Sequence, residues 1–495
     1  MSTVPFSMSD LGAIAPEILI TLGASLVLLY GAFDNPRQRP GRFAWITFAT
    51  IALAASALVV QAPDLSLGGS VFSGLLATDS FGVFFSGLFL LAAALAVGTS
   101  IRFLDDQQAH QPEFYFFLLT ALLGMLVMAR SIDFVTIFVG LELQALSIYV
   151  LVGYLKADRK SNEGGLKYFI LGGFSSGIFL YAISLLYALT GTTRLQGIRE
   201  AIVSDGLQEQ PVMIAALVLM AAALGFKVAA VPFHVWAPDA YTGGPTPVSL
   251  FITVASKAAA FAVLLRVFLV AMAPMQESWS LLLAVLSLAT MSFGNIAALT
   301  QDNIKRMLAY SSIAHAGYAM MGVVAAANVD HDAAAFAVAA TLFYLLAYTF
   351  MNIGAWATVA LLRRQGLAGE NLDDYAGLAS RSYWAFSAML LYLLSLGGIP
   401  PTGGFLGKWY VFSATIQSGW GWLAVAGVIN TAISLYYYLR IVVVMCMRDA
   451  PDDVELVRST PLTLTLVAAA IMTLLVGIWA SPFLAWVQSA TLPLS

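Results

Sequence analysis

The stretch Gly225–Lys257 reads GFKVAAVPFHVWAPDAYTGGPTPVSLFITVASK and places two lysines, Lys227 and Lys257, within otherwise apolar sequence. Between them lies an interruption rich in proline and glycine: Pro232, Pro238, Gly243, Gly244, Pro245 and Pro247. A charged side chain at the centre of a bilayer costs about 2.5–3.5 kcal/mol even on lenient insertion scales. Two lysines beside a broken apolar helix therefore indicate an ion or proton site.

The rest of the chain has the composition of an integral membrane protein. Of its 495 residues, 60% are hydrophobic and 10% are charged, and the mean hydropathy is +0.86. Soluble domains carry about 25% charged residues. The apolar runs reach the ~20 residues that a helix needs to cross ~30 Å of hydrocarbon, without the alternation of an outer-membrane barrel. We therefore predict an all-α polytopic membrane protein, whose first apolar run is retained because no basic signal-peptide segment precedes it.

These runs predict about fourteen transmembrane spans within a single membrane domain over residues 1–495. The expected ranges are 11–31, 43–62, 80–103, 113–129, 132–155, 166–189, 211–242 (broken), 245–270, 279–299, 305–326, 333–362, 384–416 (broken), 421–445 and 461–486. Residues 11–103 hold three N-terminal helices, and 461–486 hold the last helix.

A second interruption mirrors the first. Leu396–Phe412 reads LGGIPPTGGFLGKWYVF, an apolar helix followed by a glycine- and proline-rich break and then Lys408. The breaks fall in spans seven and twelve, so a unit of five helices repeated once (113–270, then 279–445) would reverse its orientation in the membrane. Interrupted segments at corresponding places in two halves are typical of transporter binding sites, although glycine and proline are also common in ordinary membrane helices.

Basic residues in the loops predict the orientation. One side would hold sixteen: Arg37, Arg39, Arg42, Arg102, Lys156, Arg159, Lys160, Lys167, Lys305, Arg306, Arg363, Arg364, Arg381, Arg440, Arg448 and Arg458. The other would hold three: Arg130, Arg194 and Arg199. The positive-inside rule places the basic side in the cytoplasm and both termini outside.

Glu142 lies near the middle of the fifth span, where an isolated carboxylate should be paired or protonated. We predict that it pairs with Lys227 and tunes its charge. The alternative is an ion pair that only packs helices, which is a poor way to gain stability.

Lys257 and Lys408 have no acidic residue in their own spans. They should lose their protons more easily than a paired lysine, as members of a relay must. The alternative for Lys227, Lys257 and Lys408 is that the side chains extend to a membrane interface, which is plausible only near the end of a span.

Other polar residues are weaker candidates. His315, at the centre of the tenth span, could bridge the lysines through water, or could simply be hydrogen-bonded by a neighbouring helix. His234 could cap a half-helix or contact water. Lys167 opens the sixth span at the cytoplasmic side, where a solvated lysine is unremarkable. Glu17 is expected at an interface or a subunit contact.

Cysteine and histidine usage argues against a cofactor in this chain. Cys446 is the only cysteine, and the four histidines form no paired set within the spans. We therefore expect no disulfide, iron–sulfur cluster, thiolate metal site or bis-histidine haem.

Several segments together resemble the antiporter-like membrane subunits of bacterial respiratory complex I over nearly the whole length. They are APEILIT, VGLELQALSIYVLVGY, EGGLKYFILGGFSSGIFLYAISLLYALTGT, GFKVAAVPFHVWAPDAYTGGPTPVSLFI, QDNIKRMLAYSSIAHAGYAMMG and LSLGGIPPTGGFLGKWYVF. The KYFILGGFSSG segment is typical of the subunit N branch, and the long lateral helix of subunit L is missing.

The resemblance implies a fourteen-helix proton pump with two inverted five-helix repeats. Glu142 and Lys227 would be its charged pair, Lys257 its central relay lysine and Lys408 its exit-side lysine. NAD, FMN, the iron–sulfur clusters and the quinone would be bound by other subunits of this NADH:quinone oxidoreductase. Expected partners are subunits M, K, J and A in the bacterial inner membrane. The alternative function is a sodium–proton antiporter without redox coupling, which would share the same lysines.

Overall fold

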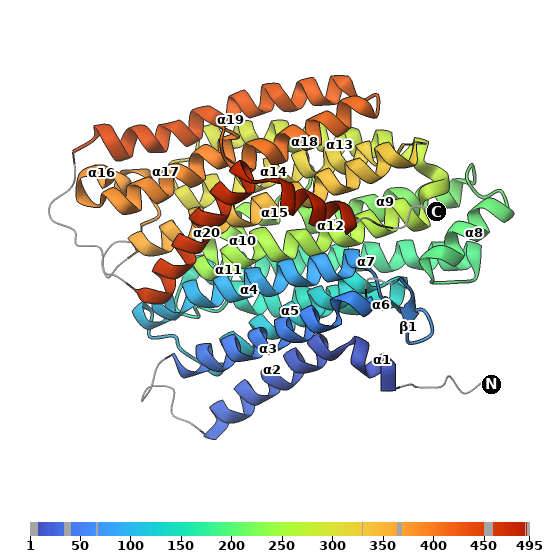
Figure 1. Cartoon of the computed structure of the whole chain (residues 1–495), viewed down its shortest axis with the longest axis horizontal. Helices are drawn as coiled ribbons and strands as arrows, with labels where there is room; N and C mark the ends of the chain where they lie inside the picture. Colours follow the sequence, from blue (N-terminus) through green and yellow to red (C-terminus); the bar gives the residue numbers. More distant parts are fainter. Residues whose placement is uncertain are drawn as a thin grey trace.

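The protein is a bundle of long, roughly parallel helices (Figure 1). The computed structural model describes residues 8–33, 41–65, 68–328, 330–363, 369–449, 459–490 and 492. The N-terminal helices lie along one edge of the bundle, and α13, α18 and α19 lie toward the opposite edge (Figure 1). In order along the chain, the first part comprises α1 (Met8–Ala13), α2 (Ala15–Phe33), α3 (Arg42–Leu65), β1 (Ser70–Val71), β2 (Leu76–Ala77), α4 (Ser80–Asp106), α5 (Pro112–Arg130), α6 (Phe134–Val152), α7 (Arg159–Thr190) and α8 (Leu195–Ser204).

The central and C-terminal parts contain the breaks. Their elements are α9 (Pro211–Val228), α10 (Trp236–Gly243), α11 (Thr246–Phe251), the π-helix η1 (Ile252–Ser256), α12 (Lys257–Arg266), the π-helix η2 (Val267–Ala271), η3 (Ala273–Met275), α13 (Gln276–Leu299), α14 (Ile304–Ala325), α15 (His331–Leu362), η4 (Leu372–Tyr375), α16 (Leu378–Arg381), α17 (Tyr383–Gly397), α18 (Gly403–Gln417), α19 (Gly421–Met447), α20 (Thr460–Ile478) and α21 (Ser481–Ser489).

The prediction of an all-α polytopic membrane protein is confirmed. Twelve segments of the described chain are long and apolar enough to cross a membrane, counting Thr246–Ala271 as one. The helix α14 and the α17–α18 pair occupy the two remaining predicted spans. Within the described chain, these twelve segments have the apolar length needed to cross the hydrocarbon.

The structure differs from the predicted spans in small elements. Residues 461–486 were expected to form one helix, but α20 ends at Ile478 and α21 begins at Ser481. Pro482 at the start of α21 lacks the backbone N–H that a continuous helix needs, which explains the break. The β1–β2 hairpin and the amphipathic helix α8 were not predicted.

Both predicted breaks are present. The helix α9 ends at Val228, where Ala229 adopts the left-handed conformation with φ 60°, and α17 ends at Gly397, where Gly398 has φ 80°. Helices commonly end on a left-handed residue, because it turns the chain out of the helical path. The two halves therefore share this feature, whereas their relation as an inverted repeat stays a prediction.

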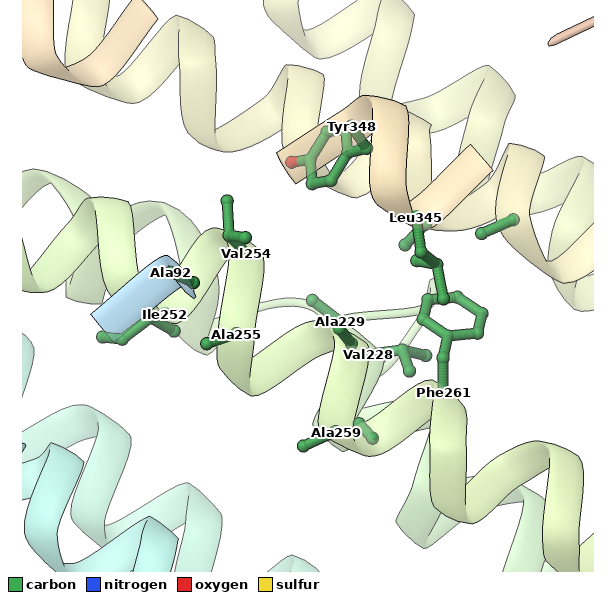
Figure 2. Close-up of a cluster of buried hydrophobic side chains, with 14 of the residues drawn as sticks. Ala92, Val228, Ala229, Ile252, Val254, Ala255, Ala259, Phe261, Leu345 and Tyr348 are labelled. Atoms are coloured by element: carbon green, nitrogen blue, oxygen red, sulfur yellow. The ribbon is translucent and has the colours of Figure 1, made fainter. Parts of the chain in front are cut away.

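The segment that carries Lys257 lies at the centre of the bundle. Thr246–Ala271 is 100% buried and α15 is 89% buried over their apolar windows, compared with 33–39% for α2, α3, α7 and α20. Alanines on α12 allow the close helix contacts that membrane bundles favour. Figure 2 shows this region, with Leu345 and Tyr348 of α15 directed toward η1 and α12.

We call the end of the bundle with Lys156, Arg159, Lys305 and Arg363 the basic side. It contains the start of α7, the start of α14 and the end of α15. Of the basic residues counted for the orientation, Arg37, Arg39, Arg364 and Arg458 lie outside the described residues. The cytoplasmic location of this side stays a prediction.

Candidate functional site

Glu142, Ser176 and Lys227 come together from α6, α7 and α9. The Ser176 hydroxyl donates a hydrogen bond to Glu142 Oε1 and accepts one from Lys227 Nζ at 3.4 Å. The two charged groups make no direct ion pair in the structure, so the expected pairing is mediated by a serine. A hydroxyl that donates to a carboxylate and accepts from an ammonium can also pass a proton between them.

Lys257 begins α12 directly after the π-helix η1 and is 3% exposed. Its ammonium donates to both the carbonyl oxygen and the hydroxyl of Ser312 on α14, each at 2.6 Å. A π-helical turn inside an α-helix often marks a functional position. Because both contacts are to neutral oxygens, the charge on Lys257 has no carboxylate to offset its burial.

His315 lies three residues further along α14, in a group of hydroxyls. Its Nδ1 is 2.6 Å from the Tyr344 hydroxyl, and its Nε2 is 3.2 Å from the Tyr438 hydroxyl. Tyr438 also shares a short hydrogen bond with Ser311. Along α14, His315 lies between Ser312, which accepts from Lys257, and Tyr318, whose ring lies 4.9 Å from the Lys408 ammonium. Its role as a relay member stays a prediction.

Lys408 on α18 reaches back to the end of α17. Its ammonium donates to the carbonyl oxygens of Leu396 at 3.0 Å and Gly397 at 3.4 Å, and lies 4.9 Å from the centre of the Tyr318 ring. The last carbonyls of a helix carry partial negative charge and favour a cation. The second break therefore creates the binding position for this lysine, which is 3% exposed.

The first two lysines are not brought together. No hydrogen bond or shared polar residue of the described chain joins Lys227 to Lys257. Val228 and Ala229, which follow Lys227, belong to the same buried apolar cluster as Ala259 and Phe261 of α12 (Figure 2). Gln144 of α6 nevertheless donates from Nε2 to the hydroxyl of Ser256, the residue before Lys257, so a buried polar contact reaches the central lysine's neighbour.

One polar surface of α15 was missed by sequence reasoning. Tyr348, Asn352 and Trp356 are buried, yet the Tyr348 hydroxyl, Asn352 Nδ2 and Trp356 Nε1 make no hydrogen bond of good geometry among the described residues, although Ser312 and Asn352 lie near the Tyr348 hydroxyl. The Tyr241 hydroxyl on α10 is in the same condition. Buried polar atoms are normally satisfied by protein or by ordered water. The sequence carried one signal for this surface, because Tyr344, Tyr348, Asn352 and Trp356 follow one another at intervals of four residues and so share a helix face.

The weaker candidates lie apart from the central lysines. His234 is half-buried, its Nδ1 has no partner among the described residues, and its ring packs against Phe293 with 4.6 Å between centroids. Lys167 is half-exposed on the basic side and pairs with Glu163 at 2.7 Å and Asp239 at 2.8 Å. A role of His234 or Lys167 in transport stays a prediction.

Glu17 lies at the other end of the bundle, in the first turn of α2. It makes a buried ion pair with Arg130 at 2.8 Å, and Arg130 also donates to the carbonyl oxygen of Ala13 at 2.8 Å. This pair connects the N-terminal helices to α5. The described residues contain no group of histidine, cysteine or carboxylate side chains that could hold a metal ion.

Comparison with known proteins agrees with this architecture. The family described as NADH:quinone oxidoreductase/Mrp antiporter, TM, matches residues 131–434. The chain is 41% identical to NADH-quinone oxidoreductase subunit N of Trichlorobacter lovleyi over 98% of both chains, and 42% identical to subunit N 2 of Rhizobium meliloti over 97% of both.

Solved structures give the same result. A chain of respiratory complex I from Thermus thermophilus aligns with a TM-score of 0.79 at 32% identity, covering 95% of this chain and 98% of that chain. A chain of the Mrp complex from Dietzia sp. shares the fold, with a TM-score of 0.84 at 18% identity over 98% and 97% of the chains. Full-length identity above 40% to the subunit N relatives goes beyond this shared fold. The chain therefore belongs to the NADH:quinone oxidoreductase/Mrp antiporter family, and within it to the NADH-quinone oxidoreductase subunit N group.

Proposed function

We propose that this chain is the subunit N-type proton-translocating subunit of a respiratory NADH–quinone oxidoreductase. The observation that carries the proposal is the buried polar group on α14, where Ser312 contacts Lys257, His315 contacts two tyrosine hydroxyls and the Tyr318 ring lies against Lys408. Buried ionisable groups in a membrane protein are costly to maintain and mark ion or proton pathways. A structural spacer between other subunits would not need them.

The relay uses the chemistry of each group in turn. A proton on Lys257 passes first to the Ser312 hydroxyl and then to His315. The ring nitrogens of His315 contact the hydroxyls of Tyr344 on α15 and Tyr438 on α19. From there it passes to Lys408 at the end of α17. Positive charges on Lys257, His315 and Lys408 repel one another at short range. Arrival of one proton therefore favours departure of the next.

The serine-bridged pair supplies the coupling. While Glu142 and Lys227 are linked through Ser176, the negative charge of Glu142 offsets the positive charge of Lys227. The electrostatic repulsion that Lys227 exerts on Lys257 is then reduced. Separation of the pair would move a proton from Lys227 toward Lys257. The apolar cluster between them then acts as a gate, because water must enter it before a proton can pass. Redox chemistry elsewhere in the complex would drive this separation.

The polar surface of α15 offers a second connection to the centre. The stretch from Tyr344 to Trp356 covers about 18 Å along the helix, at 1.5 Å per residue. It begins at the His315 contact and runs toward the basic side. Water bound to the unsatisfied atoms of Tyr348, Asn352 and Trp356 would admit protons from that side.

Cofactors and partners follow from the same assignment. NAD, FMN, the iron–sulfur clusters and the quinone are bound by other subunits of the complex, and this chain contributes transport alone. Its neighbours are the antiporter-like subunit M and the small subunits K, J and A. It resides in the bacterial inner membrane, with both termini on the periplasmic side.

The rival function is a sodium–proton antiporter that works without electron transfer. The two functions are distinguished by purifying the affinity-tagged full chain from its native membrane in mild detergent. We expect NADH-dependent quinone reduction to copurify, and proton uptake by the reconstituted complex to require NADH and quinone but not sodium. Recovery of sodium–proton exchange without any quinone-reducing activity would refute the proposal.

A further inference from the structure

Two cavities adjoin on the outside of the bundle at the basic side. The deeper one, about 290 Å³, is formed by apolar side chains of α5, α6 and α7, among them Leu143 and Phe169. The shallower one, about 960 Å³, is bounded by the loop between α6 and α7 and by the start of α5. Phe117 and Val150 line both cavities, so together they form one groove, which we call the α5–α6 groove.

The depth of the groove matches one leaflet of a bilayer. Along α6 its lining extends from Leu143 to Gly153, about 15 Å at 1.5 Å per residue. This is half of the ~30 Å hydrocarbon thickness. The Thr120 and Ser147 hydroxyls, which share a hydrogen bond of 2.9 Å, line its deep part. An apolar groove of half the membrane thickness with cations at its mouth matches one acyl chain and the head group of a lipid.

Charged side chains surround the shallow end. Lys156 and Arg159 line it, are exposed, and have no carboxylate partner among the residues that the structure describes. The nearby Asp158 carboxylate is engaged with the Lys160 backbone N–H at 2.9 Å, capping α7. Lysine and arginine beside a membrane helix bind lipid phosphates, and arginine can do so with two parallel hydrogen bonds. Glu113, also exposed there, can receive an ammonium group.

We propose that the α5–α6 groove binds one glycerophospholipid from the leaflet on the basic side. Its phosphate contacts Lys156 and Arg159, and one acyl chain lies against Phe117 and Val150. The carboxylate of Glu113 beside two cations fits a zwitterionic head group with a primary ammonium, as in phosphatidylethanolamine. The lipid would brace the loop that joins α6 to α7, the helices that carry Glu142 and Ser176.

Native mass spectrometry of the purified full chain tests the site directly. The protein is delipidated and then offered phosphatidylethanolamine or phosphatidylglycerol in mixed micelles. We expect one retained lipid, with the ethanolamine lipid preferred. Substituting both Lys156→Ala and Arg159→Ala should weaken lipid binding about a hundredfold, since each charge-assisted contact contributes about a factor of ten. Lys160→Ala, which removes a neighbouring cation outside the groove, should leave occupancy unchanged.

The apolar part has its own matched pair of variants. Val150→Trp fills the shared section of the groove, whereas Val139→Trp adds the same side chain at an exposed position of α6 outside it. Only Val150→Trp should displace the lipid. Equal retention by all variants would overturn the proposal. So would a photo-cross-linking residue at the exposed groove position Leu146 that, in the assembled complex, forms an adduct with a polypeptide instead of a lipid.

Discussion

Ser176 and Ser175 are neighbours on α7 with different roles. Ser176 links Glu142 to Lys227, whereas Ser175 donates to the backbone carbonyl of Ala223 at 3.3 Å and only packs α7 on α9. A hydrogen bond to a charged group contributes about 1.5–3 kcal/mol. Ser176 therefore contacts both charged groups, whereas its neighbour Ser175 contacts only the backbone of α9.

Ser176→Ala should therefore slow proton translocation at least about tenfold, because a loss of about 1.4 kcal/mol in the transfer step has that effect. The measurement is NADH-driven acidification of proteoliposomes that contain the complex. Ser175→Ala is the control and should pump at the wild-type rate. Equal rates for the two variants would contradict the serine bridge.

The individual site residues could be predicted only in part. Lys227, Lys257, Lys408 and Glu142 are visible in the sequence because a charge inside an apolar span is costly and rare. Ser176 and Ser312 could not be selected, since serine is common in membrane helices and its partners are set by tertiary packing. The apolar separation of Lys227 from Lys257 depends on how α9 packs against α12, which the sequence does not reveal.

At the scale of elements, α15 combines burial with unsatisfied polar groups. Asn352→Leu should lower the rate of proton translocation while leaving unfolding stability unchanged or higher, because it removes a buried amide nitrogen that makes no hydrogen bond of good geometry to the described residues. The two measurements are proteoliposome acidification and the midpoint of denaturation in mixed detergent.

The control on the same helix is Thr358→Val, since the Thr358 hydroxyl donates only to the carbonyl oxygen of Gly354 at 2.9 Å. It should pump normally. If Asn352→Leu loses stability and retains pumping, the amide serves packing and the α15 pathway is wrong.

The ion pair between Arg130 and Glu17 holds α2 against α5. Arg130→Met should destabilise the folded chain by about 3–5 kcal/mol, because it leaves the Glu17 carboxylate buried without its partner. Adding Glu17→Gln to this variant should recover much of the loss. The destabilisation is measured from the denaturation midpoints of the wild type, the single variant and the double variant. If Glu17→Gln does not relieve the destabilisation caused by Arg130→Met, the two residues do not act as a buried ion pair.

The elements that could be predicted are those whose sequence carries a clear physical signal. Long apolar runs and proline-rich breaks located the spans and both interruptions, since the bilayer demands length and satisfied backbone groups. The π-helix η1 has no signature of its own in the sequence. The α20–α21 break was missed because Pro482 follows a run that remains apolar.

For the whole molecule, the orientation is a further testable prediction. In a Cys446→Ser background, which removes the only native cysteine, a single cysteine is introduced as Lys156→Cys on the basic side or Asp205→Cys after α8. The positive-inside rule predicts that a membrane-impermeant maleimide labels Lys156→Cys only in inside-out vesicles and Asp205→Cys only in right-side-out vesicles. The reverse pattern would contradict the predicted orientation.

The central claim is that amines buried in the bundle conduct protons, with Lys257 at the centre. The most direct test counts protons translocated per NADH oxidised by the reconstituted complex that carries Lys257→Met, with Lys160→Met, at an exposed position, as the control. We expect Lys257→Met to abolish pumping and the Lys160→Met control to keep the wild-type ratio of protons to NADH. A wild-type ratio in Lys257→Met would contradict it.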